Sequence, residues 1–121
     1  MYQPDIGKDG RAIAPPGRWE PAEATARINE CAGRDDLDLW PVLWVLAWLE
    51  QQPIIMGDLL HLLSTGYVYD EAVETSMAGL YFKYTVEGPT PNSNGRTLTA
   101  VVVPNGGRKI KVCSVEWKDQ K

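Results

Sequence analysis

Three stretches in the last third of the chain, at residues 80–87, 96–103 and 109–117, show strand-like patterns: the first and third alternate between hydrophobic and polar residues, and the middle one ends in three valines that are apolar on both faces. Alternation with period two, together with many β-branched and aromatic residues, predicts three consecutive antiparallel strands. A loop rich in proline, glycine and asparagine joins the first two strands, and residues 104–107 supply a tight turn before the third. The apolar positions of the third strand change phase between Val112 and Ser114, which predicts a β-bulge there.

Apolar residues follow a helical spacing in the first half of the chain. One helix is expected to begin at Pro21, and another spans residues 54–65. Between them, residues 39–49 are apolar almost throughout and predict a further helix, because a first helical turn tolerates Pro41. With a short strand at residues 67–73, we predict an α+β fold. In it, two to three N-terminal helices pack on one face of a twisted antiparallel sheet of three to four strands.

The length of 121 residues fits a single domain, which we place at residues 19–121. A flexible tail is expected at residues 1–18, which hold three prolines and three glycines. Cys31 and Cys113 lie far apart and match no metal spacing, which favours a reduced, cytoplasmic protein. The N-terminus lacks the apolar core of a signal peptide, and no apolar run reaches the roughly 18 residues of a membrane span.

The net charge of −4 is unevenly distributed. Residues 1–65 carry five lysines and arginines against ten acidic residues, whereas residues 96–121 carry six against two. An acidic helical half joined to a basic end of the sheet can meet a phosphate backbone on one side only. The simpler interpretation is that the charges solubilise opposite faces of the molecule.

Few residues of this chain can carry catalytic chemistry. The sequence has no glycine-rich phosphate loop, no nucleophile elbow and no paired Cys/His metal spacing, so we expect neither a cofactor nor a metal. His61 is the only histidine. It fits a proton-transfer group, and it also fits a solvent-side helical residue beside Asp58.

Cationic and aromatic side chains gather on the predicted strands. Metal-free cleavage of RNA by the ribose hydroxyl requires a base, an acid and cations on the phosphate, while aromatic rings stack on bases. Basic side chains on an exposed sheet face are also common without any such role. The residues concerned are Lys83, Arg96, Arg108, Lys109, Lys111 and Lys118, together with Tyr81 and Tyr84.

Three tryptophans recur every four residues, at Trp40, Trp44 and Trp48, so we expect them to form one stripe on the apolar helix. Two interpretations remain open. The stripe packs against the sheet as core, or it forms a binding surface for another chain, where tryptophan is a frequent anchor.

Residues 53–117 resemble a family of small bacterial proteins of unassigned function. That family is grouped with the MqsR and RelE type toxins of toxin–antitoxin systems. The resembling stretches are IIMGDLLHLLSTGYV at residues 54–68, YFKYTVEG at 81–88, GRTL at 95–98 and the strand at 110–115, with PAEATARI at 21–28 as the first helix. The resemblance implies a compact α/β toxin fold that cleaves messenger RNA, often on the ribosome, and is silenced by an antitoxin.

In MqsR-like relatives a lysine just after the last strand assists cleavage, and Lys118 falls at that place. The family's second helix usually carries an H-A-x-x-R-M signature. Its histidine would fall at Trp44, its arginine at Trp48 and a further arginine at Gln52, so the polar signature is replaced here. The chain therefore either does its chemistry from the sheet or has kept the fold for binding.

Two hypotheses follow. The first is a toxin-like, metal-independent mRNA endoribonuclease with a cognate antitoxin and with mRNA or the ribosome as target. Its catalytic candidates are Lys118, Arg96, Tyr84 and His61, and its RNA-binding candidates are Lys83, Lys109, Lys111, Arg108 and Tyr81. The second is a non-catalytic interaction module of the same fold, which binds a partner or forms a homodimer through Trp40, Trp44 and Trp48.

Overall fold

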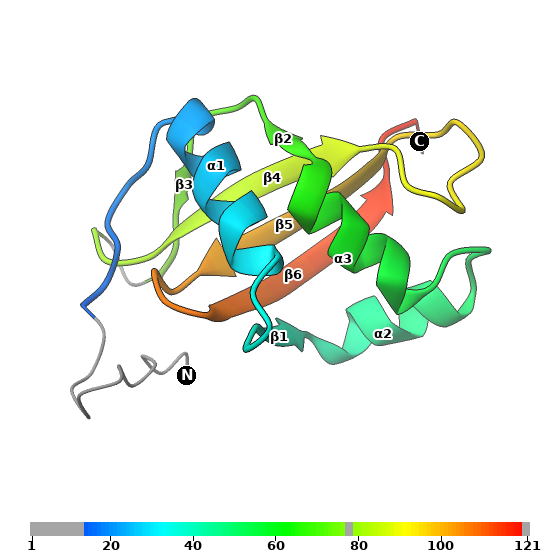
Figure 1. The fold of residues 1–121 in the computed structure, drawn as a ribbon, viewed down its shortest axis with the longest axis horizontal. Helices are drawn as coiled ribbons and strands as arrows, with labels where there is room; N and C mark the ends of the chain where they lie inside the picture. The colour runs from blue at the N-terminus through cyan, green and yellow to red at the C-terminus, as the bar shows by residue number, and fades with distance from the viewer. Residues whose placement is uncertain (1–13, 77–78, 120–121) are drawn as a thin grey trace.

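In the computed structural model, which describes residues 14–76 and 79–119, the chain forms three helices and six strands (Figure 1). The helices are α1 (Pro21–Ala32), α2 (Leu43–Glu50) and α3 (Met56–Thr65). The strands are β1 (Asp38–Pro41), β2 (Tyr67–Val68), β3 (Val73–Glu74), β4 (Phe82–Gly88), β5 (Leu98–Pro104) and β6 (Lys109–Trp117). The predicted α+β class is confirmed.

The strands form one sheet in the order β1-β6-β5-β4-β2, and β3 pairs with β4 next to β2. Strands β4, β5 and β6 form the predicted antiparallel meander. The sheet is nevertheless larger than predicted, because β1 adds a sixth strand and pairs parallel to β6, with Trp40 beside Lys111. The sheet is therefore mixed, and the prediction of three to four purely antiparallel strands was wrong.

The single helix predicted over residues 39–49 is instead a strand followed by a shorter helix. The backbone of β1 is bonded to β6, since the Asp38 N–H donates to the Arg108 carbonyl at 2.9 Å and the Val42 N–H donates to the Val112 carbonyl at 3.1 Å. Pro41 also disfavours a helical conformation in the residue before it. Trp40 consequently lies on a strand, and the predicted stripe of three tryptophans on one helix does not exist.

The predicted β-bulge is confirmed in β6. Val101 of β5 lies opposite Ser114, whereas Val102 lies opposite Val112, so Cys113 is the extra residue. The bulge keeps Val115, which lies opposite Ala100, on the same buried face as Val112.

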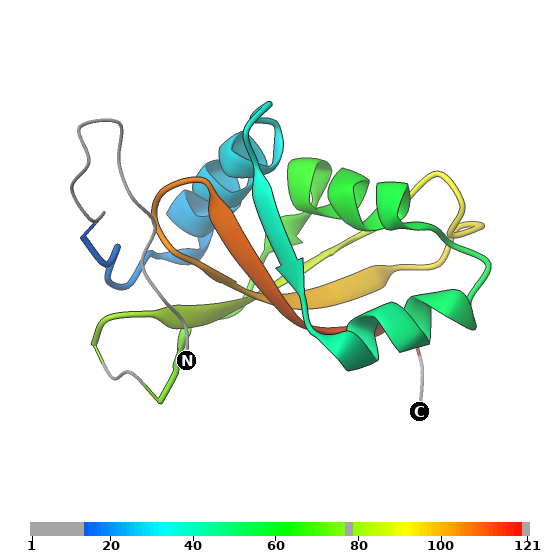
Figure 2. The same ribbon diagram turned by 90° about the horizontal axis from the view of Figure 1, so that it is seen from below.

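Helices α1 and α3 lie side by side over this buried face of the sheet, as the second view shows (Figure 2). The residues that alternate with the buried ones, including Lys83 and Lys111, belong to the opposite face, which we name the far face. Helix α2 does not lie beside α1 and α3. It continues the line of β1 along the outer edge of β6 (Figure 1).

The N-terminal segment is attached to the loops before β3 and β4. The Gly17 N–H donates to the Leu80 carbonyl at 3.4 Å, and Arg18 forms ion pairs with Glu20 and Glu71. Residues 1–13 of the predicted flexible tail lie outside the described residues.

Gly66 ends α3 at a point where only glycine fits. Its φ of −75° is open to any residue, so backbone freedom is not the reason. A Cβ at this position would lie 2.6 Å from the Leu62 carbonyl oxygen and 2.8 Å from Val86 Cγ1. The missing side chain thus lets the end of α3 approach β4 closely.

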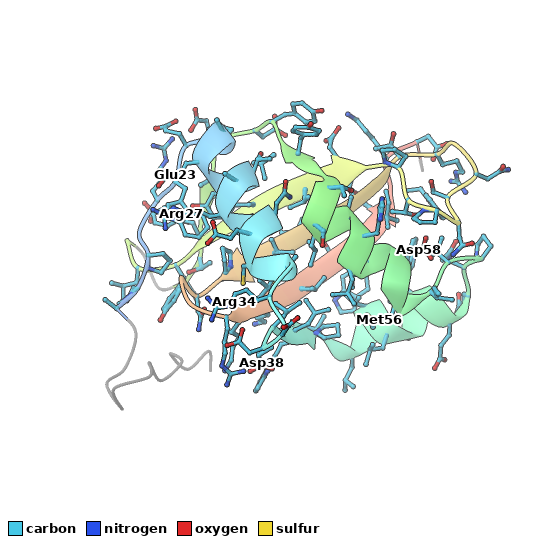
Figure 3. All side chains as sticks on the ribbon, viewed as in Figure 1. Glu23, Arg27, Arg34, Asp38, Met56 and Asp58 are labelled. Carbon is cyan, nitrogen blue, oxygen red and sulfur yellow. The ribbon has the colours of Figure 1, made fainter. Side chains whose placement is uncertain are left out.

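Asp58 fastens the β4–β5 loop to the first turn of α3 (Figure 3). Its carboxylate is almost fully buried and accepts a hydrogen bond from the Ile55 N–H at 2.8 Å. It also accepts hydrogen bonds from the backbone N–H and the side-chain amide of Asn92, each at 2.9 Å. Burial raises the pKa of Asp58, but the hydrogen bonds from Ile55 and Asn92 outweigh that effect and lower the pKa to about 2. The sequence pattern placed Asp58 beside His61 on the solvent side of the helix, and for Asp58 that prediction was wrong.

We expect Asp58→Asn to lower the free energy of unfolding by about 1–3 kcal/mol near neutral pH, because an amide cannot accept all three hydrogen bonds. The folded pKa of about 2 lies below the ordinary value for an unfolded aspartate. The stabilisation is therefore complete above the unfolded pKa and is lost as the pH falls through the folded pKa. Urea unfolding of both proteins between pH 2 and pH 7 measures this.

Asp119→Asn is the matched control, because Asp119 is an exposed partner of Arg96. It should leave the free energy of unfolding nearly unchanged, because solvent screens an exposed ion pair. If wild type and Asp58→Asn differ by the same amount at every pH, the ionised carboxylate is not what holds the loop.

Candidate functional site

Two of the predicted site residues, Tyr84 and Tyr81, are buried. The Tyr84 side chain is 2% exposed, its ring stacks on Trp19 with centroids 5.5 Å apart, and its hydroxyl accepts a hydrogen bond from the Trp19 N–H at 2.8 Å. Burial raises the pKa of Tyr84, which keeps the hydroxyl neutral. Tyr81 is 3% exposed. In this structure Tyr84 cannot exchange a proton with a substrate, and Tyr81 cannot stack on a base.

The other catalytic candidates do not share one site. His61 is exposed on α3, on the helical side of the sheet. Arg96 and Lys118 lie together where β5 begins and β6 ends, and both line a shallow hollow there. Arg96 lies 4.1 Å from the centre of the Trp117 ring and pairs with Asp119 at 2.9 Å. No acid–base pair is assembled among the four candidates.

Lys118 is paired as well. Its Nζ lies 2.5 Å from Glu87 Oε1, and this hydrogen bond raises the pKa of Lys118. The amine therefore stays charged, but its charge is balanced by a carboxylate on β4, which lies beyond β5 in the sheet. A phosphate would have to displace Glu87 to bind here.

Three of the predicted RNA-binding lysines share the far face. Lys111 is paired with Val103, and the pairing of β4 with β5 brings Lys83 to the other side of Val103. The side-chain ammonium groups of Lys83 and Lys111 form no hydrogen bond or ion pair within the described part of the chain. Lys109 lies two residues before Lys111 on the same face.

Arg108 and Lys109 are drawn toward β1 by Asp38. Lys109 Nζ lies 3.9 Å from Asp38 Oδ2 and 4.4 Å from the centre of the Trp40 ring. Arg108 Nη1 lies 4.0 Å from the same carboxylate oxygen and donates to the Asp36 carbonyl at 3.3 Å. At this edge of the far face, Lys109 therefore lies over the exposed Trp40 ring, and Asp38 partly neutralises its charge.

A group of exposed apolar side chains continues from this edge onto α2. We name it the Trp surface and define it by Trp40, Leu43, Trp44 and Leu46. These side chains are 54%, 85%, 53% and 37% exposed, respectively. Trp48 differs, because it is packed against Trp117 with ring centroids 6.0 Å apart. Of the predicted partner-binding tryptophans, Trp40 and Trp44 are on the surface and Trp48 adjoins the core.

The apolar exposure of α2 is a property of its sequence. Val45 and Leu49 anchor the helix in the core, and the remaining positions are again apolar except Glu50. A helix that is apolar on all sides is normally buried on all sides. Here the sheet edge covers only part of it. Several exposed apolar side chains on one short segment mark a candidate site for binding another molecule.

Sequence reasoning missed a cavity of about 460 Å³ beside α1, where Glu23, Arg27 and Arg34 are labelled in Figure 3. The cavity holds little reactive chemistry. Arg27 pairs with Glu23 and Arg34 pairs with Asp36, each at 2.8 Å. Burial raises the pKa of Cys31, which lines the cavity, to about 11, so its thiol is not a nucleophile near neutral pH.

Within the described ranges, no group of three or more His, Cys, Asp or Glu side chains is placed to hold a metal ion. None of the helices in the same ranges has the length and apolar character needed to cross a membrane. Comparison of the chain with protein-family models, curated proteins and solved structures found no match. The site must therefore be judged on its own geometry.

We expect Trp44→Ala to lower the free energy of unfolding by only about 1–2 kcal/mol, since half of the side chain is already exposed. Trp117→Ala should cost about 3–5 kcal/mol, because Trp117 is buried against Trp48 and donates a hydrogen bond to Gln52. Urea unfolding followed by far-ultraviolet circular dichroism compares the two. Equal losses would mean that Trp44 belongs to the core.

Proposed function

We propose that this chain is a non-catalytic protein-interaction module that binds a protein partner through the Trp surface. The observation that carries the proposal is the joint exposure of Trp40, Leu43 and Trp44 on one edge of the molecule. Burying apolar surface is worth roughly 25 cal/mol per Å². Removing these side chains from water on binding a partner therefore contributes favourable free energy to association.

The surface also has the anatomy of a binding site. Aromatic anchors at the centre with charges at the rim characterise protein interfaces. Trp40 and Trp44 are the aromatic residues, and Lys109 and Lys111 stand at the rim beside Trp40. The four side chains come from β1 and the first turns of α2, both of which are fixed by β6, so the surface is held in place before a partner arrives.

Placing the photo-crosslinking amino acid p-benzoylphenylalanine at Leu43 tests this function directly. Leu43 is 85% exposed, so the larger side chain will not disturb folding. On irradiation of living cells we expect a discrete adduct between this chain and a protein that mass spectrometry identifies, because a docked partner lies within reach of the probe.

The same probe at His61, an exposed position on α3, is the matched control and should give no such adduct. Adding Trp44→Ala to the Leu43 variant should reduce the yield several-fold, because it removes an anchor next to the probe. A Leu43 probe that yields no protein adduct, or an adduct unaffected by Trp44→Ala, contradicts the proposal.

The ribonuclease hypothesis is a second proposal, and a specific observation favours it. Lys83 and Lys111 share the far face, and neither ammonium has a hydrogen-bond or ion-pair partner among the described residues, which favours binding of a phosphate. With Lys109 and the exposed Trp40 ring they form a cationic and aromatic strip, the combination that single-stranded nucleic acids use. The separation of His61 from Arg96 and Lys118 is what places this function second.

If the ribonuclease proposal is correct, expression of the chain alone should arrest growth and degrade transcripts. Arg96→Ala with Lys118→Ala, or Lys83→Ala with Lys111→Ala, should then relieve the arrest by removing phosphate contacts. RNA sequencing and growth curves measure this. Intact transcripts and normal growth with the wild-type chain would rule the activity out.

A further inference from the structure

The exposed side of α2 has a polarity along its axis. Leu43, Leu46 and Glu50 follow one another at helical spacing, and all three are exposed. The amino end has no side-chain cap and no acidic residue in its first turn. The carboxyl end carries Glu50, whose carboxylate forms no hydrogen bond or ion pair in the described part of the chain.

Resting on the proposed function, we propose that the occupant of the Trp surface is a second copy of this chain, bound as an antiparallel two-fold pair of α2 helices. A two-fold interface brings the same patch of both copies together, so residue i meets residue j and j meets i. In this arrangement Leu46 and Ala47 lie near the symmetry axis. Leu43 of each copy faces Glu50 of the other.

The charge of Glu50 and the dipole of α2 favour the antiparallel pairing. The amino end of a helix has unsatisfied N–H groups and a positive dipole end, which a carboxylate stabilises. The first turn of α2 contains no such carboxylate, and antiparallel pairing places Glu50 of the other copy there. A parallel pair would instead bring the two Glu50 carboxylates together.

The area of the Trp surface sets the strength of the pair. A buried aromatic side chain removes roughly 150–250 Å² from water, so the exposed parts of the four side chains amount to about 400–500 Å² per copy. A symmetric pair buries on the order of 900 Å² through them. That area is below the roughly 1,600 Å² of a standard interface and typical of weak association. We expect a reversible dimer with a Kd on the order of micromolar.

A second copy is also the occupant with the best match in chemistry. The exposed side of α2 is apolar except for one charge, Glu50, at its carboxyl end. The α2 helix of a second copy offers an apolar side of equal length, and its single acid, Glu50, reaches the amino end of the first helix. Nothing on the exposed side of α2 selects for a strongly charged partner.

The test is the oligomeric state of the full chain by analytical ultracentrifugation from about 1 to 500 μM. Wild type should pass from monomer to dimer over this range. Leu43→Asp should raise the Kd at least tenfold, because it places a carboxylate in an apolar contact and opposite Glu50. The substitution leaves folding intact, since Leu43 is exposed and an acid in a first helical turn is favourable.

A charge exchange between the two copies tests the antiparallel pairing. Glu50→Lys also suits its own helix, because a cation favours the carboxyl end. In the double variant Leu43→Asp/Glu50→Lys, each introduced carboxylate faces an introduced ammonium of the other copy. The dimer should therefore recover at least threefold in Kd relative to Leu43→Asp. His61→Asp on α3 is the control and should leave the Kd unchanged.

A wild type that stays monomeric at every concentration overturns the second copy as occupant, and so does a dimer that Leu43→Asp does not weaken. Failure of the double variant to recover overturns the antiparallel pairing. The proposed function is judged separately by the identity of the Leu43 photo-adduct. An adduct with a different protein supports the interaction module and rejects the homodimer, whereas no adduct rejects the module itself.

Discussion

The parallel pairing of β1 with β6 is the interaction on which the rest of the arrangement depends. It extends only from Asp38 to Pro41, and the bulge at Cys113 begins directly after Val112, the last residue of β6 that pairs with β1. Beyond the bulge no strand of the described residues pairs with the outer edge of β6, and α2 lies there instead. One short ladder therefore fixes Trp40 on the far face and sends the apolar helix along the edge.

A helix at a sheet edge buries less of its surface than a helix that lies on a sheet face. Val45 and Leu49 reach the core, and Trp48 packs on Trp117, but the sheet has no further surface to offer the other side of α2. The exposed tryptophan and leucine side chains are thus a geometric result of the topology. This is why the interaction function is supported better than the catalytic one, whose residues the same topology separates.

The sequence predicted the elements whose pattern is local and periodic. The meander, the bulge in β6 and the positions of α1 and α3 were all recoverable from alternation, helical spacing and turn residues. It could not predict β1, because residues 38–41 become a strand only through pairing with a strand some 70 residues away. Asp58 was misplaced for a similar reason, since its partner Asn92 lies in a distant loop. Of the three tryptophans that the spacing singled out, Trp40 and Trp44 are exposed, whereas Trp48 packs against Trp117.

The buried carboxylate of Asp58 has a thermodynamic consequence for the whole right-hand end of the molecule in Figure 1. It joins the amide of Ile55 to the amide of Asn92, although the two are far apart in sequence. Neither amide can be exposed to solvent without breaking its hydrogen bond to the Asp58 carboxylate that both share. The segment from α2 to α3 and the β4–β5 loop should therefore open as one cooperative unit in hydrogen exchange. The segment that follows α2 is thus held in place by a loop that lies more than 30 residues further along the chain.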